Sequence, residues 1–190
     1  MRVESTASGA GNGEQASIPI DKLVVLPFEG MPGDLVAALA RELRERGVTV
    51  SIGAALALPD SAYVRARDQY QASALLYAVR TSGAPHALGL THRDLFVEEL
   101  NFVFGVADAA GRACVVSIAR LAADGDEALL RARILKEIVH ELGHTLGLKH
   151  CPDPRCVMHF SNSIFDTDRK SDAYCNGCLR RLAPHTGGRR

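Results

Sequence analysis

Two histidines and a glutamate near residue 140 have the spacing of a catalytic metal site. His140 and His144 are four residues apart, so on a helix of 100° per residue their imidazoles differ by only about 40°. Both can therefore reach a common ion at about 2.0–2.1 Å. Glu141 lies about 100° from His140, beside the ion without being aimed at it, which suits a general base acting on metal-bound water.

Apolar residues of the same segment fall on the other side of the helix. With His140 as zero, Ile138 and Leu142 lie at about 160° and 200°, so we expect the core opposite the histidines. Hydrogen-bonded core histidines are the alternative, and this orientation argues against them. A third ligand requires the chain to leave the helix, which Gly147 permits, and His150 can then return toward the ion. Three neutral nitrogens leave a fourth position for water, as in catalytic zinc sites.

Four of the five cysteines form two close pairs in the last quarter of the chain. With four and two intervening residues, the pairs are Cys151 with Cys156 and Cys175 with Cys178. Such thiolate pairs favour a closed, structural zinc site, with two disulfides or free thiols as the alternative. Because Cys151 directly follows His150, we expect the structural zinc to fix where the third histidine stands. Cys114 lies in an apolar run and is interpreted as an inert buried thiol.

The remaining sequence predicts the elements that position these side chains. The helix with the histidines is expected from Asp126 to about Gly147. The elements before it are expected to be strand Lys22–Leu26, helix Asp34–Arg46 capped by Asp34, strand Val48–Ile52, helix Ala72–Val79, and strands Ala87–Leu90, Asn101–Val106 and Cys114–Ile118. This order predicts a mixed α/β or α+β fold with a partly parallel sheet, whose last two strands are antiparallel because their connection is short.

Length and composition fit one catalytic domain. The 190 residues, 47% of them apolar, provide one well-buried core. We expect a single domain over residues 20–183, with an N-terminal lobe at about 20–147 and an irregular C-terminal lobe at about 148–183 that zinc holds together. Residues 1–19 are predicted to be a disordered tail and residues 184–190 a frayed end.

Charge and hydropathy narrow the range of partners. Lys plus Arg and Asp plus Glu number 22 each, so no net field attracts nucleic acid or an anionic membrane. No run approaches the roughly 18 apolar residues of a membrane span, and the N-terminus lacks a signal-peptide pattern. We therefore expect a cytoplasmic protein that binds neither nucleic acid nor membrane. The sequence gives no indication of its oligomeric state.

Taken together, the histidines, the cysteines after them and Met158 resemble the archaemetzincins, a metzincin family of zinc metallopeptidases. The similarity extends over roughly residues 88 to 178. It implies a twisted mixed sheet whose antiparallel edge strand, placed at Leu100–Val106, lies above the active-site helix and receives extended substrate. It also implies that Met158 packs beneath the imidazoles.

Some metzincins carry a tyrosine two residues after this methionine that can approach the metal. This sequence has Phe160 there, so that hydroxyl is missing. Tyr174 could replace it only if the fold brings it near, and we interpret Tyr174 as a packing residue. His159 is not included in the predicted site.

These observations lead to a hypothesis of peptide hydrolysis with two Zn²⁺ per chain, one catalytic and one structural. Glu141 would accept a proton from zinc-bound water and deliver it to the leaving amine of a peptide or protein substrate. The resemblance adds a narrow range of substrates, with aminopeptidase action as one form. Two alternatives are a zinc-dependent peptide-binding module with vestigial activity, which the intact Glu141 argues against, and hydrolysis of a non-peptide amide.

Overall fold

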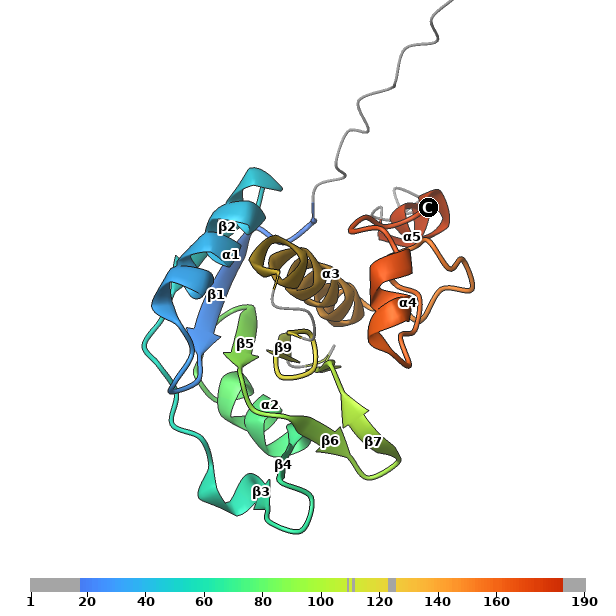
Figure 1. Cartoon of the computed structure of the whole chain (residues 1–190). Coiled ribbons are helices and arrows are strands. Elements are labelled where there is room, and N and C mark those ends of the chain that lie inside the picture. Colours follow the sequence, from blue (N-terminus) through green and yellow to red (C-terminus); the bar gives the residue numbers. More distant parts are fainter. Residues whose placement is uncertain (1–17, 109, 111, 123–125, 183–190) are drawn as a thin grey trace, which may run out of the picture.

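The computed structural model describes residues 18–108, 110, 112–122 and 126–182 (Figure 1). Its helices are α1 (Gly33–Glu45), α2 (Ala72–Arg80), α3 (Glu127–Thr145), α4 (Ile164–Arg169) and α5 (Asn176–Leu182), with a 3-10 turn at Asp60–Ala62. Its strands are β1 (Lys22–Pro27), β2 (Thr49–Ile52), β3 (Tyr63–Val64), β4 (Gln69–Gln71), β5 (Ala87–Thr91), β6 (Leu95–Val97), β7 (Leu100–Val103), β8 (Gly105–Asp108) and β9 (Ala113–Ser117). No helix among the described residues is long and apolar enough to cross a membrane.

A five-stranded mixed sheet forms the centre of the fold, in the order β2-β1-β5-β9-β8. β1 pairs in parallel with β2 and β5, and β5 in parallel with β9. β8 lies at one end of the sheet, opposite β2, and runs antiparallel to β9. The predicted mixed sheet with an antiparallel edge strand is confirmed.

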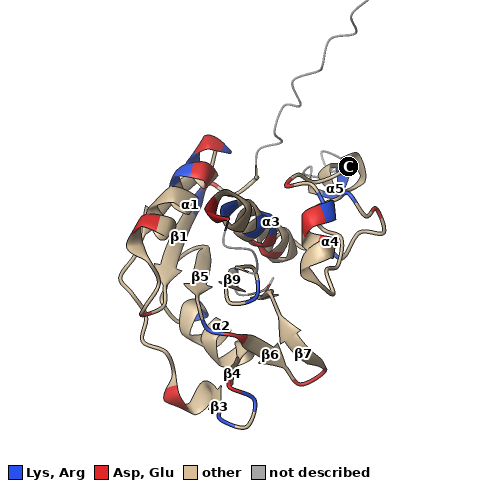
Figure 2. Ribbon diagram, in the orientation of Figure 1, with Lys and Arg blue, Asp and Glu red and all other residues tan. Residues whose placement is uncertain are grey.

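Helices cover both faces of this sheet. Alternate residues of a strand point to opposite faces, and β1 follows this rule: Leu23 and Val25 pack with residues of α1 and α3, whereas Leu26 packs with residues of α2. The sheet therefore separates two apolar clusters. Figure 2 shows acidic and basic residues next to one another along α1 and α3, in keeping with the equal numbers of the two charges.

The predicted strand Asn101–Val106 is wrong in one respect, because the segment is divided between two sheets. β7 belongs to a second sheet of order β3-β4-β6-β7, which was not predicted, and β8 belongs to the central sheet. The chain changes partners at the buried residue Phe104, whose carbonyl oxygen accepts a hydrogen bond from Ser117 N at 2.8 Å. The edge strand of the central sheet is thus Gly105–Asp108 and not Leu100–Val106.

Two expectations near the N-terminus are also corrected. Ile18 and Ile20 are buried in the apolar cluster of α1 and α3, so the predicted disordered tail is wrong for residues 18 and 19, and its remainder lies outside the described residues. Asp34 does not cap α1, which begins one residue earlier with the extended Pro32 as its N-cap. Asp34 lies in the first turn, where a negative charge favours the helix dipole.

The C-terminal segment is less irregular than predicted. It contains α4 and α5, and α4 begins with a capping box in which Ser163 and Asp166 satisfy each other's backbone N–H groups. Such short helices have little core of their own, which is why their pattern in the sequence is weak. The predicted frayed end at 184–190 lies outside the described residues.

Candidate metal centres

Helix α3 presents His140, His144 and Glu141. Asp126 caps the helix, as its Oδ1 accepts hydrogen bonds from the amides of Ala128 at 2.8 Å and Leu129 at 3.1 Å. The histidine side was expected to face away from the core, yet His140 and Glu141 are each only 5% exposed. The reason is that two different segments cover this side of the helix: Val157 of the C-terminal segment lies against His140, and Gly105 of β8 lies against Glu141.

The three histidines meet at one point, as their spacing predicts. The ring centroids are 4.7 Å apart for His140 and His144, 5.4 Å for His140 and His150, and 4.9 Å for His144 and His150. One nitrogen from each lies within 4.8 Å of the other two. The third histidine reaches this position because Gly147, at φ +86°, turns the chain out of the helix.

Backbone carbonyls fix the orientation of two of these rings. His140 Nδ1 donates to Val157 O at 2.7 Å and His144 Nδ1 to Leu148 O at 2.8 Å. Because a carbonyl oxygen only accepts, each Nδ1 carries the proton and each Nε2 keeps its lone pair. The two Nε2 atoms nevertheless face each other at 3.1 Å, a contact that a shared cation would make favourable.

These nitrogens fit a zinc ion in two respects. Tetrahedral zinc at about 2.0–2.1 Å from each nitrogen places two ligand nitrogens roughly 3.4 Å apart, close to the observed separation. Burial lowers the pKa of His140 well below its usual value, and it also lowers the pKa values of His144 and His150. The cluster therefore favours the neutral imidazoles that bind metal.

Glu141 and the histidines line one cavity of about 560 Å³. Strand β8 lies directly against Glu141. A Cβ atom on Gly105 would be 2.6 Å from Glu141 Cγ and 2.8 Å from Glu141 Oε1. Only glycine allows this approach of strand to carboxylate. Burial raises the pKa of Glu141 to about 8, with a further contribution from the Glu137 carboxylate and an opposing one from the Lys170 ammonium.

Met158 lies under α3 beside the histidines. A Cβ on Gly143 would overlap Met158 Sδ and lie 3.0 Å from Tyr174 Cε1, so both side chains pack against the bare helix backbone there. Tyr174 is buried and its hydroxyl donates to Val139 O at 2.8 Å, which supports the packing interpretation. Phe160 packs beside His150, with ring centroids 4.8 Å apart and the two rings tilted by 50°.

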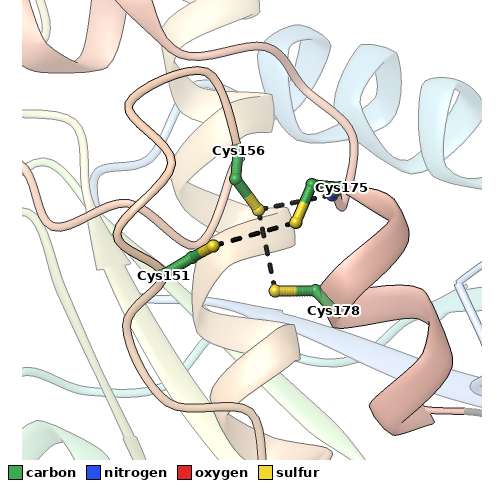
Figure 3. Close-up of side chains that lie close together, drawn as sticks. All are labelled: Cys151, Cys156, Cys175 and Cys178. Atoms are coloured by element: carbon green, nitrogen blue, oxygen red, sulfur yellow. Dashed lines mark hydrogen bonds between the residues drawn. The ribbon is translucent and has the colours of Figure 1, made fainter.

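The four paired cysteines converge on a second centre (Figure 3). Sγ of Cys151 is 3.7 Å from Sγ of Cys175, and Sγ of Cys156 is 3.7 Å from Sγ of Cys178. Tetrahedral zinc at about 2.3 Å from each sulfur places sulfurs about 3.8 Å apart, so this set also fits zinc. Burial alone would raise the pKa of Cys175, but hydrogen bonds from the Cys178 backbone and neighbouring thiols lower it to about 7. All five cysteines are free, and Cys114 is buried as predicted.

Short backbone contacts link the two centres. Cys151 N donates to Met158 O at 2.9 Å, and Val157, whose carbonyl orients His140, donates its own N–H to Ala173 O at 3.0 Å. His159 was not included in the site, and its Nδ1 lies 3.0 Å from Cys151 O. The loop after His150 therefore contributes to both clusters at once.

Sequence reasoning missed a buried ion pair beside the histidines. Glu137 Oε1 lies 3.0 Å from Lys170 Nζ, and the two side chains are 3% and 0% exposed. Glu137 precedes Glu141 by four residues, so helical spacing could have placed it on the same side of α3. The sequence carries no comparable indication for Lys170, which directly follows α4.

A mixed sheet with an antiparallel edge strand, laid across a helix that presents histidines and a glutamate to an open cavity, defines a zinc metallopeptidase. The profile of "Peptidase family M54" matches residues 60–184. An archaemetzincin from Pyrococcus furiosus is 40% identical over 182 residues, which cover 88% of this chain and 95% of that protein.

Solved structures agree with the sequence comparison. The crystal structure of archaemetzincin from Methanopyrus kandleri superimposes with a TM-score of 0.77 at 42% identity, covering 86% of this chain and 93% of the other. A zinc-dependent peptidase from Methanocorpusculum labreanum superimposes with a TM-score of 0.76 at 26% identity, covering 84% and 99%. The chain belongs to peptidase family M54, the archaemetzincins.

Proposed function

We propose that the chain hydrolyses peptide bonds, with zinc held by His140, His144 and His150 and with Glu141 as the general base. Bound zinc supplies a Lewis acid that polarises the substrate carbonyl and acidifies water. The Glu141 carboxylate takes a proton from the attacking water and later releases it to the leaving amine. Residues 20–183 act in this proposal as a single catalytic domain.

The position of Glu141 carries this proposal. Its carboxylate is buried in the wall of the histidine cavity, directly beneath Gly105 of the edge strand. A peptide paired with β8 would therefore pass over both the carboxylate and the imidazoles. The raised pKa favours a group that holds a proton, and a divalent cation in the histidine cluster would act in the opposite direction. The two influences together suit a group that exchanges a proton near neutral pH.

A second zinc, bound by Cys151, Cys156, Cys175 and Cys178, is the finer part of the proposal. The sulfur separations support it, and four thiolates leave no position for water. This ion would therefore order the C-terminal segment and take no part in the reaction. Metal analysis of the fully loaded protein should give two equivalents of zinc, and one equivalent would contradict the second site.

A restricted aminopeptidase action is a further refinement, supported by the resemblance to the family. It predicts that peptides with a free N-terminus are cleaved and that their N-acetylated counterparts are not. Mass spectrometry of both sets after incubation separates removal of N-terminal residues from internal cleavage.

The test of the mechanism is Glu141→Gln, which keeps the shape of the side chain and removes the base. Its zinc content should equal that of wild type, while the cleavage rate of a peptide library falls about a hundred- to ten-thousandfold. Glu127→Gln, on the exposed first turn of the same helix, is the matched control. Equal rates for Glu141→Gln and wild type would exclude Glu141 as the base. Zinc-dependent peptide binding without cleavage, or cleavage of non-peptide amides alone, would support the two alternatives.

A further inference from the structure

Glu137 is a second carboxylate in the catalytic cavity. It lines the cavity together with His140, His144 and Glu141, and it is 3% exposed. Residues four apart on a helix differ by about 40°, so Glu137 and Glu141 face the same side one turn apart. The proposed hydrolysis assigns no task to Glu137.

Within the described part of the chain, contacts occupy only one oxygen of Glu137. Thr167 Oγ1 donates to Oε1 at 2.9 Å, and Lys170 Nζ lies 3.0 Å from the same atom. Lys170 is fully buried, and its contact is a charge contact without the alignment of a hydrogen bond. Among the residues that the structure describes, Oε2 receives no hydrogen bond. A carboxylate has room for about four donors, so Oε2 can accept one from a molecule in the cavity.

The wall of the cavity that the strands form is largely apolar. The cavity of about 560 Å³ is walled on the side of the strands by Leu100, Phe102, Phe104 and Val106. Lysine and arginine side chains combine an apolar stem with a cationic tip, which matches an apolar wall that lies beside the Glu137 carboxylate. A carboxylate in a protease pocket selects basic residues on the same principle.

We propose that Glu137 Oε2 binds a cationic group of the peptide substrate and makes the enzyme selective for lysine or arginine beside the scissile bond. The inference rests on the proposed peptide hydrolysis and adds the class of substrate. Lys170 holds the carboxylate in place and balances its charge. The selectivity therefore comes from a short charge-assisted hydrogen bond, whose typical strength corresponds to about ten- to a hundredfold in relative kcat/KM.

Matched peptides test this selectivity. Each pair carries lysine or norleucine at one of the positions on either side of the scissile bond, with the N-terminus free or acetylated. Wild type should prefer lysine by about ten- to a hundredfold at one position, and Glu137→Gln should bring that ratio close to one. A wild-type ratio near one, or a ratio that Glu137→Gln leaves unchanged, would overturn the proposal. So would a preference that follows the free α-amino group instead of the side chain.

A measurement of peptide binding tests the lysine selectivity independently of the proposed hydrolysis. If wild type cleaves neither peptide of a pair, peptide hydrolysis fails, and fluorescence anisotropy with the same labelled peptides still decides the selectivity. Tighter binding of the lysine peptide to wild type than to Glu137→Gln supports the inference, and equal binding overturns it.

Two further variants show whether a lost lysine preference reflects damage to the fold or loss of the Glu137 carboxylate. Glu137→Gln leaves Lys170 without its counter-charge, so the double variant Glu137→Gln/Lys170→Met removes both charges and should also lose the lysine preference. Thr167→Val removes only the hydrogen bond to Oε1 and keeps the carboxylate, so it should retain the preference. Loss of the preference in Thr167→Val together with its retention in the double variant would contradict a direct role for Oε2.

Discussion

The histidine and cysteine clusters are neighbours in the chain that differ in their access to solvent. The histidines line a cavity of about 560 Å³, and His150 is exposed. Cys156 and Cys178 are each 1% exposed, and the sulfurs of all four paired cysteines lie close enough together for one tetrahedral ion. A metal site with an open position leaves room for water and substrate. In a closed site, by contrast, the energy of metal binding stabilises the fold.

The loop that follows His150 connects the two clusters. His150 and Cys151 are consecutive, and Met158 accepts a hydrogen bond from Cys151 while it packs under the helix of the histidines. An ion enclosed by the four cysteines, as proposed above, would exchange less readily than an ion at the histidines, so it would hold the loop steady while the histidine centre exchanges water and substrate. We therefore infer that the closed cluster positions part of the open one.

Breaking the closed cluster should have the largest effect. In Cys175→Ser, one of four thiolates is lost, so the loop with Cys151 should loosen and carry His150 and Met158 with it. The zinc affinity of the histidine cluster should then fall by more than the roughly ten- to hundredfold that is typical of a change beyond the ligands. Zinc titration at neutral pH under reducing conditions measures this affinity.

The matched control is Cys114→Ala, which removes a buried cysteine that lies outside the cluster. Its zinc affinity at the histidines should equal that of wild type. If Cys175→Ser also binds zinc at the histidines as tightly as wild type, the two centres are independent. The cysteine cluster would then not position any part of the histidine cluster.

The sequence predicted the histidine arrangement well because it depends on local geometry. His140 and His144 share one helix, and Gly147 adopts the positive φ that brings His150 back. Long-range packing explains the errors. Phe104 divides the expected edge strand because β7 and β8 join different sheets, and Lys170 reaches Glu137 from the end of α4, which is distant in the sequence. No local pattern encodes either contact.

Gly105→Ala tests the open histidine centre, because Gly105 lies against Glu141. The added Cβ would lie 2.6 Å from Glu141 Cγ and 2.8 Å from Val115 O, so the strand or the carboxylate must shift. Displacement of a catalytic group by about 1 Å can cost up to a hundredfold, and we expect kcat/KM to fall about ten- to a hundredfold. The zinc content should stay the same because no candidate ligand is touched.

Gly33→Ala is the control for this change, because its Cβ would meet no atom within 4 Å. Its kcat/KM should match wild type. Full activity of Gly105→Ala would show that the strand yields freely, and that its close approach to Glu141 is not needed for the reaction.

The smallest effect is expected where the two clusters adjoin, in Tyr174→Phe. Tyr174 precedes Cys175, packs against Gly143 and Met158, and donates a buried hydrogen bond to Val139 O at 2.8 Å. Losing this bond should lower the free energy of unfolding by about 1 kcal/mol, measured by denaturant unfolding of the zinc-loaded protein. The hydroxyl is engaged with the helix backbone, so the cleavage rate should be unchanged. Tyr77→Phe, at a side chain that is 60% exposed, should change neither quantity. A large loss of cleavage rate with little loss of stability in Tyr174→Phe would instead show that this hydroxyl reaches the substrate, and the open centre would then include a residue of the enclosed segment.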